Sequence, residues 1–211
     1  MKYEKEYDVI VVGAGHAGIE AALAPARMGL KTLILTISLD HIGRMSCNPA
    51  VGGPGKSQIV REIDALGGEI AKAADATHLQ LKMLNLSKGP AVHSLRAQSD
   101  IAEYIKYMSQ TLENQENLDV KQGMVTDLIM NKKTFQGVKT KEGFDYYAKA
   151  VVLTTGTFLR GRIYTGLQER AAGRAGENPA EELTASLNKH GINTGRLKTG
   201  TPPRIDAKTV D

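Results

Sequence analysis

Val12-Gly13-Ala14-Gly15-His16-Ala17-Gly18 is the stretch of sequence that decides the fold. It fits the pattern G-x-G-x-x-G, in which the first glycine permits a tight turn, the second lets the backbone approach a pyrophosphate, and the third lets a helix pack close to a strand. The run 8–12 before it is typical of a strand buried on both faces of a parallel sheet, a helix is predicted over 17–28 and a second strand over 30–35. Because the motif lies in this β-α-β frame, it specifically indicates a dinucleotide-binding α/β domain.

The start of that helix offers unpaired N–H groups and a positive dipole end to phosphates. The cofactor-binding residues predicted in the turn are Gly13, Ala14, Gly15, His16, Ala17 and Gly18. We interpret His16 as a contributor of backbone and not as a catalytic residue. The acidic residue that usually grips the ribose is replaced by Thr36, whose hydroxyl can hydrogen-bond a ribose, and Asp40 is the alternative. Pro25 predicts a local kink in the helix, because it removes a hydrogen bond.

The composition excludes several classes of protein. A length of 211 residues allows one domain, or one domain and part of another. The single cysteine, Cys47, excludes an internal disulfide and indicates a reducing, cytoplasmic setting. No apolar run reaches the roughly 18 residues that span a bilayer, so no membrane association is expected, and no metal site is predicted. The net charge of +4 permits a nucleic acid partner without requiring one.

Residues 40–56 form a glycine-rich loop around Cys47. Its end, Gly55-Lys56-Ser57, is similar to a P-loop, but Ala50 stands where that template needs glycine, so a nucleoside triphosphate site is disfavoured. The better interpretation is a loop that opens a helix beside a flavin. The cofactor-binding residues predicted here are Asn48, Gly52, Gly53 and Lys56. Two interpretations of Cys47 stay open, a small buried hydrophobic residue or a reactive thiol.

Three further helices are predicted. In the helix that begins near Lys56, the apolar residues share one face, and Gly67-Gly68 interrupts it. These apolar residues are Ile59, Ile63, Leu66 and Ile70. The next helix begins at Asp100, with Glu103 in the capping-box position. Its predicted buried stripe is Ile101, Ile105, Met108 and Leu112. The last helix is expected over 179–190, with Asn178 as N-cap, Pro179 at its first position, Glu181 at the capping-box position and Gly191 after its end.

Short strands are predicted across 120–147, followed by a buried strand over 150–153. That strand is closed by Thr154-Thr155-Gly156, which resembles the second signature of FAD-containing two-dinucleotide-binding flavoproteins. FAD is therefore favoured over NAD. Thr155 and Gly156 are predicted to bind the cofactor, and the resemblance implies that Val125 offers its backbone to the adenine.

Motifs along the whole chain resemble the glucose-inhibited division protein A family, the FAD subunit of the tRNA uridine 5-carboxymethylaminomethyl modification enzyme. Beyond the glycine turn and the loop 46–56, the matching stretches are 64–68, 87–92, 96–98, 156–159, 173–177 and 195–204. The resemblance implies an α/β, Rossmann-like FAD-binding domain of the two-dinucleotide-binding flavoprotein type. Pro25 departs from the alanine usual in the family.

The resemblance also implies an activity. The family binds FAD and NADH, works as a homodimer with a GTPase partner (MnmE), and modifies the wobble uridine of tRNA with methylenetetrahydrofolate as carbon donor. Cys47 corresponds to the family's loop cysteine, for which addition to C6 of the uracil is implied. The family's second cysteine has no counterpart among these 211 residues.

Family members are roughly three times as long, so we expect the chain to be a truncated FAD-binding domain. Its parts are the β-α-β motif 1–36, the reactive loop 40–56, the strands 120–156 that close the ADP side, and the arginine- and glycine-rich segment 157–211. The NADH-binding insertion and the C-terminal helical domain are expected to lie outside it. Whether the chain is an enzyme by itself stays open.

The segment 160–204 is rich in arginine, which pairs with phosphate in bidentate fashion. The residues predicted to contact tRNA are Arg174, Arg196, Lys198 and Arg204. A solvated face with ion pairs, for example to Glu177, is the competing interpretation. Two alternative functions also stay open, a non-catalytic dinucleotide- or tRNA-binding module and a generic FAD or NAD oxidoreductase acting on a small metabolite.

Overall fold

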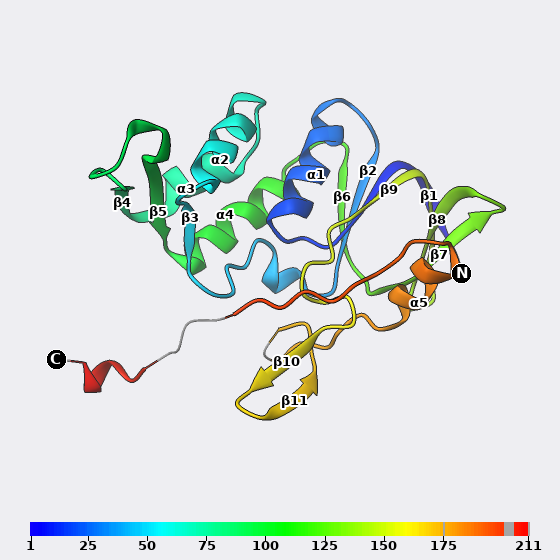
Figure 1. Cartoon of the computed structure of the whole chain (residues 1–211). Coiled ribbons are helices and arrows are strands. Elements are labelled where there is room, and N and C mark those ends of the chain that lie inside the picture. Colours follow the sequence, from blue (N-terminus) through cyan, green and yellow to red (C-terminus); the bar gives the residue numbers. More distant parts are fainter. Residues whose placement is uncertain (175, 201–204, 211) are drawn as a thin grey trace.

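The computed structural model describes residues 1–174, 176–200 and 205–210 (Figure 1). The strands are β1 Lys2–Val12, β2 Thr32–Thr36, β3 Ala50–Gly52, β4 His78–Leu84, β5 Ser94–Ser99, β6 Leu118–Gln122, β7 Val125–Asn131, β8 Thr134–Thr140, β9 Asp145–Leu153, β10 Arg162–Thr165 and β11 Gln168–Ala171. The helices are α1 His16–Arg27, α2 Lys56–Ala65, α3 Ile70–Thr77, α4 Ile101–Glu113 and α5 Glu182–Lys189. The short 3-10 helices are η1 Leu39–His41, η2 Pro90–Val92 and η3 Ala207–Thr209.

A six-stranded sheet of order β6-β2-β1-β9-β8-β7 forms the centre of the molecule. The strands β6, β2, β1 and β9 pair in parallel, whereas β8 and β7 continue as an antiparallel meander. The chain leaves β1 toward β2 on one side and returns to β9 on the other, so a topological switch point lies at the carboxyl end of β1. The predicted parallel α/β architecture is confirmed.

Apolar residues of the central strands are buried on both faces of this sheet. Val11 and Ile34 pack with α1 and α4, whereas Ile10 and Leu33 face the cluster that contains β7, β8 and α5. This two-sided burial is why these strands read as continuous apolar runs without polar alternation. Among the residues described, no helix is both long and apolar enough to cross a membrane.

A second unit stands beside the sheet, at the opposite end of the molecule from β7 and β8 (Figure 1). It is a three-stranded antiparallel sheet of order β3-β5-β4, against which α2 and α3 pack. None of these strands was predicted from the sequence, and β3 lies inside the region 40–54 that was expected to be loop. The strand β3 has only three residues and β5 is mostly polar, so both carry little strand signal. The strand β4 does alternate apolar and polar residues, at Leu79, Leu81 and Met83, and this pattern was overlooked.

The helix α1 runs unbroken through Pro25 to Arg27. Only two helical residues follow this proline, so one lost hydrogen bond in the last turn does not end the helix. The helix stops as predicted at Gly29, whose φ of +83° a glycine adopts without strain. The kink expected at Pro25 stays a prediction.

The break at Gly67-Gly68 separates α2 from α3 as predicted, but two of the apolar residues predicted to share a face of α2 are exposed. Leu66 has an exposed fraction of 90% and Ile59 one of 56%. The helix instead turns Ser57 and Val60 toward the small sheet. Periodicity shows that apolar residues share a face, but it does not show that this part of the chain covers it.

The helix α4 begins as predicted, with the Asp100 side chain accepting hydrogen bonds from the N–H groups of Ala102 and Glu103. The reciprocal half of the capping box does not form, because the Asp100 N–H donates to the Thr77 carbonyl. The buried stripe is also rotated relative to the prediction. Tyr104 is fully buried while Ile101 is exposed, and Met108 and Leu112 are buried as expected.

The helix α5 begins three residues later than predicted. Its N-cap is Glu181, without a side-chain cap, and Asn178 and Pro179 lie outside the helix. The reason is a bridge between Leu159 and Ala180, which holds the backbone there in an extended form. The predicted end is correct, since Gly191 has a φ of +82° and follows the C-cap.

Candidate functional site: a dinucleotide crevice

The glycine turn lies at the carboxyl edge of the parallel strands and is closed by contacts that exclude side chains. A Cβ atom on Gly13 would lie 2.5 Å from the Thr154 carbonyl oxygen, and one on Gly18 would lie 1.8 Å from the Gly13 carbonyl oxygen. Gly13 also has a φ of +104°. Backbone atoms cannot yield as a flexible side chain does, so both positions require glycine, and the predicted tight turn and close helix packing are confirmed.

Gly15 differs from these two glycines. It is the N-cap of α1, it is exposed, and a Cβ atom built on it meets nothing within 4 Å. No side-chain cap covers the start of the helix, and within the described residues the N–H groups of His16, Ala17 and Gly18 have no backbone acceptor. Open space in front of free N–H groups at a helix N-terminus suits a pyrophosphate, so the turn fits a dinucleotide.

The second signature meets the first in this structure. The Thr154 hydroxyl donates to the carbonyl oxygens of Val12 and Gly13, at 2.9 and 3.0 Å. The following Thr155 is half-buried, and Gly156 is exposed with a φ of +55°. The structure therefore brings the glycine turn and the stretch that contains Thr155 and Gly156 together at the switch between β1 and β9.

Thr36 and Val125 lie along the same edge of the sheet. Thr36 ends β2, and its buried hydroxyl donates to the Ser38 carbonyl oxygen at 3.1 Å. Its own carbonyl accepts from the N–H of Gly123, which leads into β7 and Val125. The Val125 side chain is buried in the core, so only its backbone is available to a ligand. The roles of both residues toward ribose and adenine stay predictions.

His16 has a different environment from the rest of the turn. Its ring lies against Tyr104, with 5.6 Å between the ring centroids. Burial lowers the pKa of His16 below its ordinary value, which keeps the imidazole neutral. A neutral, half-buried ring supports the interpretation of His16 as a structural residue of the turn.

The Cys47 loop follows η1 and is anchored at its start. Ile42 and Met45 are buried in the core, and the Gly43 N–H donates to the Ala14 carbonyl oxygen at 2.9 Å, which ties the loop to the glycine turn. Cys47 itself is exposed and free. The buried hydrophobic interpretation of this cysteine is therefore wrong, and an accessible thiol is what the structure presents.

The other predicted loop residues lie at the junction of β3 and α2. A Cβ atom on Gly52 would lie 2.3 Å from the Leu95 carbonyl oxygen, and the Gly53 N–H donates to that same oxygen at 2.8 Å. These glycines therefore serve the pairing of β3 with β5. Asn48 and Lys56 are exposed. Cofactor contact by these four residues stays a prediction.

The predicted tRNA-contacting residues have different environments. Arg174 is engaged by Glu177, whereas Arg196 and Lys198 are exposed, with the Arg196 guanidinium donating to the Arg160 carbonyl oxygen at 3.0 Å. Arg204 lies outside the described residues. The two exposed cations stay candidates for contact with phosphate.

An ion cluster of His41, Arg174 and Glu177 was not predicted as a unit. Arg174 donates to Glu177 in bidentate fashion, at 2.6 and 3.0 Å, and His41 Nδ1 lies 2.8 Å from Glu177 Oε1. Glu177 appeared in the sequence only as one of several possible ion-pair partners. No sequence signal connects it to His41, because the two residues are 136 positions apart. Within the described ranges no His, Cys, Asp and Glu side chains are grouped to hold a metal.

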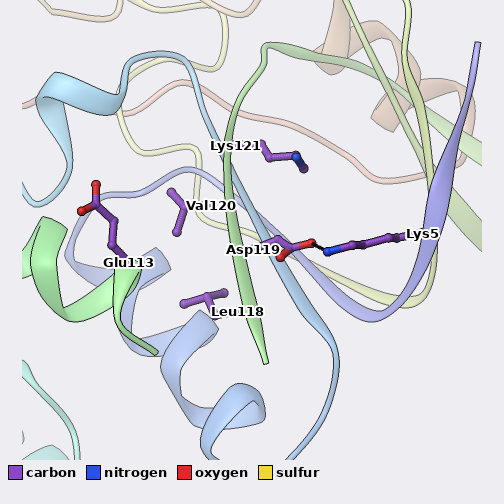
Figure 2. Close-up of a pocket in the computed structure, with 6 residues that line it drawn as sticks. All are labelled: Lys5, Glu113, Leu118, Asp119, Val120 and Lys121. Carbon is purple, nitrogen blue, oxygen red and sulfur yellow. Dashed lines mark hydrogen bonds and ion pairs between the residues drawn. The ribbon is translucent and has the colours of Figure 1, made fainter. Parts of the chain in front are cut away.

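Two hollows occur away from the glycine turn. One of about 240 Å³ lies on the edge strand β6, where Lys5 pairs with Asp119 at 2.9 Å (Figure 2). Its lining residues are Lys5, Glu113, Leu118, Asp119, Val120 and Lys121. Another of about 160 Å³ lies between α2 and the small sheet and includes Gly52 and Ser57. Neither contains a residue of the glycine turn.

The comparison with known families decides the identity of the chain. Residues 8–211 match the family described as glucose inhibited division protein A. The chain belongs to the glucose inhibited division protein A family. This assignment confirms the resemblance drawn from the sequence motifs.

Relatives of this glucose inhibited division protein A chain carry a functional name. It is 56% identical to the "tRNA uridine 5-carboxymethylaminomethyl modification enzyme MnmG" of Synechocystis sp., over 100% of the chain and 33% of the relative. The protein of the same name from Thermodesulfovibrio yellowstonii is also 56% identical, over 100% of the chain and 34% of the relative. The chain thus spans about a third of the length of the curated relatives it matches and corresponds to their N-terminal portion.

Solved structures of the glucose inhibited division protein A family agree with the fold. The GidA structure from Aquifex aeolicus matches with a TM-score of 0.93 and 53% identity, over 98% of this chain and 34% of that one. The GidA-related protein from Thermus thermophilus matches with a TM-score of 0.65 and 25% identity, over 88% of this chain and 68% of that one.

Proposed function

We propose that the chain is the FAD-binding part of an enzyme that installs the 5-carboxymethylaminomethyl group on the wobble uridine of tRNA. The complete enzyme would use NADH, methylenetetrahydrofolate and the GTPase partner MnmE, as a cytoplasmic homodimer. The observation that carries the proposal is the glycine turn with an open Gly15, joined by Thr154 to the end of β9, in a chain whose relatives are named as MnmG. The NADH-binding and helical domains would lie beyond residue 211.

FAD supplies the redox chemistry when it is bound. In this proposal the N-terminus of α1 holds the pyrophosphate, and Gly15 allows its close approach. Thr36 lies where a ribose hydroxyl is expected, and the backbone before Val125 lies beside it, next to the expected adenine. The residues Thr155 and Gly156 border the crevice from the other side.

Cys47 is proposed as the nucleophile. Its exposed thiol would lose its proton to solvent, and the thiolate Sγ would form a bond to C6 of the uracil. The electron pair of the C5–C6 double bond would move to C5 and its conjugated carbonyl, so that C5 becomes reactive toward an electrophilic carbon. The exposed Arg196 and Lys198 are proposed to attract the tRNA backbone.

Titration of the 211-residue chain with FAD tests the binding part of the proposal. We expect a bound flavin and a loss of affinity in Gly15→Ala, because the added methyl group enters the space reserved for the pyrophosphate. Gly89→Ala is the matched control, since its Cβ atom also meets nothing within 4 Å. Gly89 lies between β4 and β5 of the small sheet, and not in the glycine turn. Equal affinity in Gly15→Ala and Gly89→Ala would contradict the site assignment.

A tRNA modification assay tests the catalytic part. In a protein of the full length of its relatives, Cys47→Ala is expected to abolish modification while retaining FAD. Ser46→Ala, at the neighbouring exposed position, is the control. Modification at the normal rate by Cys47→Ala would refute the role of the thiol.

A further inference from the structure

The cluster of His41, Arg174 and Glu177 joins two segments that leave the central sheet on opposite sides of β1. His41 ends η1, which follows β2, whereas Arg174 and Glu177 belong to the segment after β9. In Figure 1 the chain after β9 passes next to the short helix that follows β2. The contact of 2.8 Å between His41 Nδ1 and Glu177 Oε1 therefore joins the segments that follow β2 and β9, the two strands that flank β1 at the switch point.

Both sides of this bridge are tied to the glycine turn. On the β2 side, Gly43 lies two residues after His41, and its N–H donates to the Ala14 carbonyl oxygen. On the β9 side, Thr154 donates to the Gly13 carbonyl oxygen, and the Thr157 hydroxyl donates to the Gly173 carbonyl oxygen at 2.7 Å. The contacts form a closed ring that starts and ends at the turn, and the bridge between His41 and Glu177 completes it.

The carboxylate that makes this bridge is held firmly. Glu177 has a side-chain exposed fraction of only 14%, and burial alone would disfavour its charge. The hydrogen bonds from Arg174 and His41 more than offset that penalty, so the pKa of Glu177 lies below its ordinary value. Arg174 is fixed in turn, because its guanidinium lies 5.1 Å from the centre of the Phe158 ring.

The geometry also explains Gly173. A Cβ atom on this residue would lie 2.1 Å from the Phe158 ring, so a side chain there would displace the ring beneath Arg174. The Gly173 N–H donates to the Glu177 carbonyl oxygen at 3.0 Å, and the Glu177 N–H donates to the Arg174 carbonyl oxygen at 3.1 Å. This local structure aims the carboxylate at His41.

We propose that His41, Arg174 and Glu177 form a clasp that holds the two walls of the dinucleotide crevice together and slows release of the cofactor. The inference rests on the proposed function and deepens it, because it assigns positioning residues to the FAD site. Glu177 acts through His41, which holds the start of the Cys47 loop against the turn. Arg174 thereby serves the clasp instead of contact with tRNA.

The experiment compares His41→Ala and Glu177→Gln with the unsubstituted chain. His41→Ala removes only the bridge and leaves the pair of Arg174 and Glu177 intact. Glu169→Gln is the control, because it loses a glutamate whose contact with Arg162 is 3.7 Å long and solvent-exposed. His41→Asn keeps a donor close to the position of Nδ1 and is expected to restore part of the bridge.

Two measurements are made on each variant. Amide hydrogen exchange of residues 39–47 is followed without cofactor, and FAD release is followed after loading. In His41→Ala we expect both rates to rise about tenfold, the equivalent of one charge-assisted hydrogen bond in a partly exposed setting. The free energy of global unfolding should change little. A large change would indicate that the bridge stabilises the whole fold and not the loop in particular.

The outcomes separate the clasp from the function on which it rests. Exchange and release at the rates of the unsubstituted chain in a folded His41→Ala would overturn the clasp. If Glu177→Gln fails to fold, the exchange and release rates of His41→Ala still test whether the clasp exists. If the unsubstituted chain binds no FAD, the proposed function fails, whereas the exchange rates still show whether His41 holds the loop.

Discussion

The central sheet and the small β3-β5-β4 sheet differ in how completely the chain covers them. In the central sheet Ile10, Leu33 and Ile34 are fully buried, and helices or strands lie on both faces. In the small unit Leu66 and Leu79 have exposed fractions of 90% and 70%. These strands of the first unit are thus covered on both faces, whereas the second unit carries apolar surface that the described chain leaves open.

The two units are joined by a partly buried polar network around Glu69. Glu20 of α1 accepts hydrogen bonds from the N–H groups of Glu69 and Ile70, so a residue of the dinucleotide unit caps α3. Arg27, also in α1, donates to the Gly67 carbonyl oxygen and pairs with the buried Glu69. The difference between the units therefore does not make them independent, because α1 belongs to the core of one and organises the other.

Gly18→Ala is expected to have the largest effect, because it places a methyl group at the tightest contact of the central unit. The new methyl group would lie 1.8 Å from the Gly13 carbonyl oxygen, and α1 must move away from β1. We expect a loss of about 3 kcal/mol or more in the free energy of unfolding, measured with urea. Gly200→Ala, whose Cβ atom meets nothing within 4 Å, is the control. A stable Gly18→Ala would refute the close packing at the turn.

Arg27→Ala tests the joint between the units. It leaves the buried Glu69 carboxylate without its main partner, for which we expect a loss of about 2–3 kcal/mol. Hydrogen exchange should increase in α3 more than in β1 and β2 if the joint is where stability is lost. Arg61→Ala, on the exposed surface of α2, serves as the control. Equal effects of the two substitutions would show that the joint carries no special stability.

The pH dependence of stability follows from the same glutamate. Burial opposes ionisation of Glu69, but hydrogen bonds from Arg27 and Tyr107 more than offset it, and its pKa is lowered in the folded protein. Its contribution is fully present above the unfolded pKa of about 4.3 and is lost as the pH falls through the lower folded pKa. Glu69→Gln should therefore be less stable than the unsubstituted chain by about 1–2 kcal/mol at neutral pH, with the difference shrinking in acid. Urea unfolding from neutral pH into acid measures it, and a difference that stays constant with pH would contradict the assignment.

Leu66→Ser is expected to have the smallest effect. It tests whether the exposed apolar surface beside the small sheet contributes to stability. The side chain is almost entirely exposed, so its replacement should change the free energy of unfolding by less than about 0.5 kcal/mol. Leu33→Ser, in the covered unit, is the contrasting variant and should unfold the protein readily. A large effect of Leu66→Ser would show that the apolar face of α2 is covered after all.

The sequence predicted best what depends on local geometry. The glycine turn, the stop at Gly29 and the Asp100 cap follow from backbone constraints that a few neighbouring residues reveal. The predicted start of α5 was wrong, because the bridge from Leu159 to Ala180 delays the helix. The small sheet was missed, because its pairing joins distant residues such as Ala50 and Gln98. Of the candidate site, the stretch Thr154-Thr155-Gly156 was recognised through its resemblance to a flavoprotein signature. Its contact with Gly13 and the bridge from His41 to Glu177 were not predicted, because each depends on how remote segments of the chain are placed together.

The parallel pairing of β1 with β9 has a consequence for the order in which the protein assembles. Val9 lies beside Ala150 in this pair, so the strand that starts the chain needs a partner made about two-thirds of the way through it. Pairs this remote cost loop-closure entropy before they contribute stability, and they slow folding. On a ribosome, α1 and β2 can dock on β1 early, but the far edge of β1 must wait, exposed, until residues 145–153 have emerged.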